Sequence, residues 1–175
     1  RRDTSKLPIR AWEKDGMSHW SPASWAENSR NLPLWVAHGT KDFPLENSRV
    51  LIGRYRELGY SLNDEWPETG HAVWEKTWDG ARMWPWLTSK TRDPAPARVS
   101  LRTDSLASAE QAWARILRLE HSGSMGDLDA TIVDPTHVTA KTSAAASFAL
   151  VRSAKLSSQQ PVSIVVDGTT LSFSP

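Results

Sequence analysis

The chain has 175 residues, a length that suits one large domain or two small ones. Apolar residues make up 39% and charged residues 23%, a balance typical of globular proteins. The net charge is +1 with no clustered basic stripe, so we expect no nucleic-acid partner. No apolar run approaches the roughly 20 residues that span a membrane, and the lack of cysteine excludes disulfides and thiolate chemistry.

The N-terminal segment Arg1–Lys6 is not followed by an apolar run, so it is not expected to be a signal peptide. The sequence also lacks an initiator Met, and we therefore expect a piece of a longer chain. Nine of the ten tryptophans lie at or before Trp86, and a charged, Pro-containing stretch at 91–96 follows them. This change in composition predicts two domains, residues 1–93 and residues 98–175.

The first half alternates strand and helix patterns. The apolar run Leu32–Ala37, which ends at turn residues, predicts a strand buried on both faces of a parallel sheet. Apolar residues at near-helical spacing predict a helix over Leu45–Leu58, with Gly59 just past its C-terminal end. Alternation predicts a second strand over Tyr60–Trp66, and a Trp-rich helix is expected over Val73–Leu87. This order of elements predicts an α/β unit.

The second half contains strand patterns alone. Short segments at spacings of about 8 to 12 residues are typical of a small all-β sandwich. Asp167-Gly168 suits a type I′ hairpin turn, because both of its central residues need positive φ. The expected strands are Arg98–Thr103, Gln111–Glu120, Asp127–Asp134, His137–Ser143, Ser147–Arg152, Pro161–Val166 and Thr169–Phe173.

Two loops carry residues that suit acid–base chemistry. The segment from His38 to Asp42 (HGTKD) follows the first predicted strand, and Gly70-His71 follows the second. Ligands and catalytic groups of open α/β sheets gather at the carboxyl ends of strands, so we expect the two loops to lie side by side. Asp42 could then hydrogen-bond the imidazole of His71, which would act as a general base. The order acid then base is that of α/β-hydrolases.

The segment NLPLWVAHGTKDFPLENSRVLIGRYRELGY, followed by PETGHAVW, resembles the C-terminal end of the catalytic domain in the prolyl oligopeptidase family. That family consists of serine peptidases and related esterases. The resemblance implies that Asp42 is the acid and His71 the base of a Ser-Asp-His triad. It also implies a fold class: the C-terminal part of an α/β-hydrolase domain with a parallel sheet, followed by the small all-β sandwich.

The family's nucleophile motif, G-x-S-x-G, is absent from the sequence. Its nearest imitation, Gly16-Met17-Ser18-His19-Trp20, lacks the closing glycine. Ser18 also lies only about 24 residues before Asp42, too few for the strand and helix that normally intervene. We therefore expect the serine and the oxyanion hole to lie upstream of this chain, and the chain alone to be inactive.

Other residues have simpler interpretations. His38 is expected to pack its loop, and the histidines elsewhere lack ligand spacing, so no metal or other cofactor is predicted. Trp74, three residues after His71, could line a substrate pocket. The tryptophans that follow His71, namely Trp74, Trp78, Trp84 and Trp86, are otherwise expected in a core.

The sequence thus predicts the acid and base of a serine hydrolase that acts on a peptide or an ester, with no membrane or nucleic-acid partner. Two alternatives remain open: a non-catalytic interaction or carbohydrate-binding module on a hydrolase remnant, and an esterase of carbohydrate side groups. A parallel sheet without its central strands would expose an unpaired edge, so we also expect possible self-association through that edge.

Overall fold

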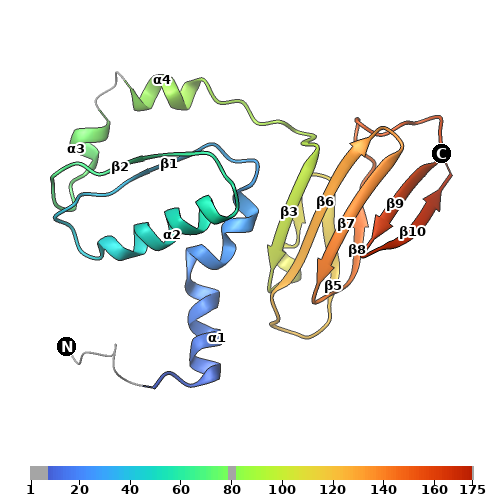
Figure 1. The fold of residues 1–175 in the computed structure, drawn as a ribbon, viewed down its shortest axis with the longest axis horizontal. Helices are drawn as coiled ribbons and strands as arrows, with labels where there is room; N and C mark the ends of the chain where they lie inside the picture. The colour runs from blue at the N-terminus through green and yellow to red at the C-terminus, as the bar shows by residue number, and fades with distance from the viewer. Residues whose placement is uncertain (1–7, 79–81, 175) are drawn as a thin grey trace.

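The protein is described by a computed structural model that covers residues 8–78 and 82–174. Figure 1 shows an elongated molecule in which a helix-containing region, residues 8–90, lies beside a β region, residues 98–174. The first region holds the candidate residues Asp42 and His71. The chain passes between the two regions through a segment that follows α4.

The first region is built around one pair of parallel strands, β1 and β2, whose register pairs Leu34 with Leu62. Figure 1 shows α2 running along one side of this pair and α4 on the other. The elements in chain order are α1 (Ala11–Trp20), the 3-10 helix η2 (Pro22–Ser29), β1 (Leu34–Ala37), α2 (Leu45–Glu57), β2 (Leu62–Glu65), α3 (Trp74–Thr77) and α4 (Met83–Thr88).

Helix α2 ends where the sequence predicts, because Gly59 takes a left-handed conformation with φ of +72°. The Gly59 N–H donates to the Arg56 carbonyl, and the Tyr60 N–H donates to the Tyr55 carbonyl. This is the Schellman pattern, in which two otherwise unpaired helix carbonyls are satisfied. The rings of Tyr55 and Tyr60 stack at 6.3 Å and join Ala26 in the small core of this region.

The β region contains two sheets. Strand order is β10-β9-β7-β6-β3 in the larger sheet and β4-β5-β8 in the smaller one. The larger sheet is mixed, because β7 and β9 are parallel while its other neighbours are antiparallel. The strands are β3 (Arg98–Thr103), β4 (Glu110–Gln111), β5 (Ala114–Leu119), β6 (Gly126–Asp134), β7 (His137–Ser143), β8 (Ala145–Leu150), β9 (Val162–Val166) and β10 (Thr169–Phe173), with a short 3-10 helix η3 (Leu106–Ser108) after β3.

Alternating residues of both sheets form one apolar core. Twelve buried side chains belong to it, among them Ile116 of β5 and Leu128 of β6, each 1% exposed. The predicted turn between β9 and β10 is confirmed, since Asp167 and Gly168 both have positive φ and Val166 pairs with Thr169. Period-2 patterning therefore predicts these strands well.

Helix η2 attaches the first region to the outer edge of β3. The side-chain amide of Asn28 donates to the Arg102 carbonyl at 2.9 Å and accepts from the Arg102 N–H at 2.7 Å. The Asn31 amide donates to the Arg98 carbonyl at 2.8 Å. These amides pair with backbone groups that would otherwise leave the edge strand open.

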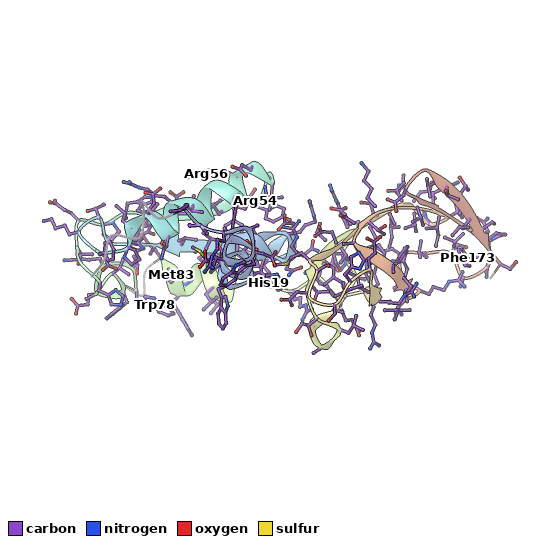
Figure 2. All side chains as sticks on the ribbon, turned by 90° about the horizontal axis from the view of Figure 1, so that it is seen from below. His19, Arg54, Arg56, Trp78, Met83 and Phe173 are labelled. Carbon is purple, nitrogen blue, oxygen red and sulfur yellow. The ribbon has the colours of Figure 1, made fainter. Side chains whose placement is uncertain are left out.

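Ionic contacts reinforce the same junction. Glu27 Oε1 lies 2.5 Å from the Arg54 guanidinium and 2.9 Å from that of Arg102, and the Glu27 side chain is mostly buried. His19, which Figure 2 labels near the middle of the molecule, contacts Asp104 at 2.7 Å. The two regions are therefore joined by directed polar contacts from α1 and η2, and Arg54 of α2 holds Glu27 in place for its contact with Arg102.

The fold class predicted from the sequence is wrong. Among the described residues, the parallel sheet has two strands and the dominant sheet is a mixed one of five, which does not match a parallel α/β-hydrolase sheet followed by an all-β sandwich. The physical reason is that periodicity predicts strands but not their neighbours. The chain leaves β8 in the small sheet and returns to place β9 parallel to β7.

Two local predictions also fail. The helix expected over Val73–Leu87 is not continuous, because α3 ends at Thr77 and Trp78 leaves helical geometry with ψ of 49°. The strand expected over Gln111–Glu120 is interrupted before Ala114, where Ala112 has a φ of +51°. The sequence does not predict α1 and η2, since α1 buries none of its residues and carries little apolar periodicity.

Candidate active site

The two loops that follow β1 and β2 are held together by their backbones. The Thr40 N–H donates to the Pro67 carbonyl and the Lys41 N–H donates to the Thr69 carbonyl, both at 2.9 Å. Gly39 lies at their crossing, where an added Cβ would come within 2.3 Å of the carbonyl oxygens of Thr69 and Gly70. Only glycine fits this approach, so the HG motif positions one loop on the other.

The crossing brings Asp42 and His71 into contact. His71 Nδ1 lies 2.9 Å from Asp42 Oδ2, and the Phe43 N–H donates to Asp42 Oδ1 at 2.8 Å. The Asp42 side chain is 15% exposed, whereas that of His71 is 83% exposed. The carboxylate is thus fixed on the protein side of the ring, and the opposite ring nitrogen of His71 faces solvent.

The electrostatics favour an ionised acid. The hydrogen bond with His71 holds the pKa of Asp42 below its usual value, and it outweighs the opposing effect of partial burial. The Phe43 N–H and the nearby charge of His71 lower this pKa further, with a smaller effect from His38. An ionised Asp42 fixes the proton of neutral His71 on Nδ1, which leaves Nε2 as a base.

Two histidines elsewhere in the described residues contact an aspartate without this arrangement. His137 contacts Asp134 at 2.8 Å, but both side chains are exposed and lie three residues apart on one hairpin. His19 contacts Asp104 at 2.7 Å, but this histidine is only 20% exposed and lies in the junction between the regions. A shielded carboxylate combined with an open imidazole is found at Asp42 and His71.

Known proteins give no independent assignment. The chain matches no protein-family model, no curated protein and no solved structure. The chemistry that Asp42 and His71 can perform therefore rests on their own geometry.

The other candidate residues have different surroundings. Trp74 packs edge-on against His71 with ring centroids 5.8 Å apart, and it is 51% exposed. The prediction that the tryptophans after His71 form a core is wrong for Trp74, Trp78 and Trp84, each more than half exposed. Ser18 lies on α1 and donates its hydroxyl to the Asp15 carbonyl, with no described contact to His71.

His38 and Ser48 lie beside the dyad, whereas the sequence predicts only a packing role for His38 and none for Ser48. His38 Nε2 lies 3.5 Å from Asp42 Oδ2, and His38 Nδ1 lies 2.7 Å from Ser48 Oγ. The position of His38, four residues before Asp42 on the same strand-end loop, could have indicated the first contact. The second depends on how the first turn of α2 packs, which spacing does not predict.

An apolar hollow of about 1360 Å³ lies between α1 and α2, and it includes Ser48 but neither Asp42 nor His71. The described part of the chain contains no group of three or more possible metal ligands. It also contains no helix of the length and apolarity that crossing a membrane requires.

Proposed function

We propose that Asp42 and His71 are the acid and the base of a Ser-Asp-His serine hydrolase that cleaves a peptide or an ester. The nucleophilic serine would be supplied by a segment upstream of these 175 residues. One observation carries this proposal: the 2.9 Å contact between a shielded Asp42 carboxylate and an imidazole whose other nitrogen is open to solvent. The resemblance of residues 31–60 and 67–74 of this chain to the prolyl oligopeptidase family supports the same assignment.

The chemistry follows from the proton positions. His71 Nε2 would take the proton of the serine hydroxyl as its oxygen bonds to the substrate carbonyl carbon. The resulting imidazolium, stabilised by Asp42, would return that proton to the leaving amine or alcohol as the scissile bond breaks. Water would then attack the acyl-enzyme while His71 takes its proton. His71 would return this proton to the serine oxygen as the acid product leaves, which regenerates the serine.

The test joins the 175 residues to their upstream sequence and measures hydrolysis of peptide and acyl-ester substrates. His71→Ala should lower kcat by about 10²- to 10⁴-fold, the usual contribution of a general base. Asp42→Ala should also lower kcat strongly, because the imidazole loses its orientation. Unchanged hydrolysis in His71→Ala would contradict the proposal.

His137→Ala is the matched control. It removes another imidazole that contacts an aspartate, at 2.8 Å, but in an exposed pair within one hairpin. We expect activity close to that of the unmodified protein. A similar loss in both histidine variants would point to general damage and not to a catalytic base.

A second candidate function is a non-catalytic module that binds carbohydrate or a protein surface. It is favoured by the unusual exposure of aromatic side chains, since Trp20 is 88% exposed and Trp78 is 58% exposed. The 175-residue chain would then bind polysaccharide on its own, and Trp78→Ala would weaken that binding. An esterase of carbohydrate side groups stays within the first proposal, and acetylated glycans in the substrate panel test it.

Self-association through the sheet edge is a further part of the proposal. Strand β1 pairs with β2 alone in the described residues, so its second edge has no strand partner there. Light scattering of the 175-residue chain tests this expectation. A monodisperse monomer over a wide concentration range would contradict it.

A further inference from the structure

His38 contacts the same carboxylate oxygen of the candidate acid, Asp42 Oδ2, that His71 contacts. It is the first residue after β1, and its side chain is only 14% exposed. Its Nδ1 lies 2.7 Å from Ser48 Oγ in the first turn of α2. Its Nε2 is buried, has no hydrogen-bond partner among the described residues and lies 3.5 Å from Asp42 Oδ2.

The surroundings of Nε2 determine where the ring proton lies. A bare Nε2 lone pair facing a carboxylate oxygen in a buried site would be repulsive, whereas an N–H there is attracted to it. Nε2 therefore carries the proton. In the neutral ring Nδ1 is then the acceptor, and Ser48 donates its hydroxyl proton to it. At 3.5 Å the Nε2 contact is longer than a normal hydrogen bond, so it acts electrostatically.

Three groups therefore contact the Asp42 carboxylate. His71 and His38 face Oδ2 from two different loop positions, and the Phe43 N–H binds Oδ1. The remaining charged side chains of these loops, Lys41 and Glu68, pair with each other at 2.9 Å in an exposed position. The rings of Trp66 and His38 lie with centroids 6.2 Å apart in a tilted arrangement. The side chains of His38 and Asp42 are only 14% and 15% exposed, so their contact is largely withdrawn from water.

We propose that His38 is a positioning residue: fixed by Ser48, it directs its Nε2–H at Asp42 and holds that carboxylate toward His71. This inference rests on the proposed function only for the catalytic role of Asp42; the contacts themselves do not depend on it. The array runs from the Ser48 hydroxyl to His38, to Asp42 and to His71. Each contact in it restrains the next group, so the orientation of the exposed base depends on a serine in α2.

The first test is the protonation state of His38, measured by ¹⁵N NMR of the 175-residue chain near neutral pH. We expect the Nε2–H tautomer, and we expect Asp42→Ala to weaken that preference. An Nδ1–H tautomer in the unmodified protein would overturn the proposal. This measurement needs no hydrolase activity, so its failure is distinguishable from failure of the proposed function.

The second test compares two substitutions of His38 through the pKa of the Asp42 carboxyl, followed by ¹³C NMR. His38→Leu removes the donor and should raise this pKa, whereas His38→Gln keeps an N–H at similar reach and should raise it less. Ser48→Ala retains the imidazole and should have an intermediate effect. Equal pKa values in the Leu and Gln variants would contradict the role of the donor.

In the protein that includes the upstream sequence, His38→Leu should lower kcat while KM stays the same, and His38→Gln should recover part of the loss. A change in KM alone would contradict a positioning role. If His71→Ala has no effect on hydrolysis while the NMR measurements show the expected His38 tautomer and Asp42 pKa changes, the proposed function is contradicted. The positioning of Asp42 by His38 would still stand.

Discussion

The two regions of the molecule are stabilised in different ways. The β region gathers twelve buried apolar residues into one cluster, whereas the main cluster of the first region contains three. Large apolar side chains of the first region face solvent, including Trp12 and Trp20. What fixes the first region is instead a set of directed contacts: the crossing at Gly39, the cap at Gly59 and the amide contacts of η2. The candidate site is therefore held by hydrogen-bond geometry more than by burial.

The largest expected difference between the regions is the cost of creating a cavity. Leu128→Ala removes a side chain that is 1% exposed in the β core and should cost about 3 kcal/mol of the free energy of unfolding. Leu62→Ala, the same truncation at the edge of the small core, should cost about 1 kcal/mol because the site is partly open. Urea denaturation, with hydrogen exchange followed in each region, measures both. Equal costs would contradict the comparison.

Gly39→Ala tests whether the loop crossing stabilises the first region. The new Cβ would meet two backbone carbonyl oxygens at 2.3 Å, and relieving this overlap should cost about 1–3 kcal/mol. The amides of Thr40 and Lys41 should exchange faster, and the contact between Asp42 and His71 should be lost in NMR spectra.

Gly53→Ala is the control for that substitution. It lies inside α2, and an added Cβ would have no neighbouring atom within 4 Å outside its own helix backbone. Because alanine favours helix, this change should stabilise α2 by about 0.5–1 kcal/mol. Destabilisation by both substitutions would show that the crossing is not the cause.

Asn28→Ala tests the junction between the regions. It removes both amide contacts with the Arg102 backbone, at a cost of about 1–2 kcal/mol. The two regions should then unfold at more widely separated temperatures in calorimetry. Asn63→Ala, an exposed substitution on β2, should change stability by no more than about 0.5 kcal/mol.

Lowering the pH should change the free energy of unfolding less than the substitutions above. It should act on the first region through one carboxyl group and on the β region through another. The pKa of Asp42 is lowered chiefly by its hydrogen bond with His71, and that of Asp167 chiefly by the Thr142 hydroxyl. A lowered folded-state pKa adds stability above the unfolded value, near pH 4, that is lost as the pH falls through the folded value.

Asp42→Asn should therefore flatten the loss of stability below about pH 4 in the first region alone. Asp167→Asn should flatten it in the β region alone, with hydrogen exchange at several pH values as the measurement. A change that spreads equally over both regions would contradict this division.

Local structure in both regions could be predicted from the sequence. Capping at Gly59 predicts the C-terminal end of α2, and the strand–helix–strand periodicity predicts the parallel pairing of β1 with β2. The positive φ that Asp167-Gly168 can adopt predicts the turn there. The sequence also predicts the two loops of the candidate site, because strand ends at one sheet edge lie close together. The catalytic roles of Asp42 and His71 stay predictions.

The arrangement of the elements could not be predicted in the same way. Whether β9 pairs with β7 or joins the smaller sheet depends on long-range packing that period-2 patterns do not contain. The break at Trp78 has no signal in the apolar spacing, since the tryptophans on both sides suit a helix. Ser48 could not be recognised, because only the three-dimensional position of α2 brings its hydroxyl to His38.

The unequal exposure of His71 and His38 has a consequence for chemical labelling. An acylating reagent such as diethyl pyrocarbonate needs an accessible, unprotonated ring nitrogen. His71 offers one on the side away from Asp42, while both nitrogens of His38 face protein groups. Modification should therefore start at His71 and leave His38 intact as long as the loops stay crossed, so that late labelling of His38 would report local opening of the site.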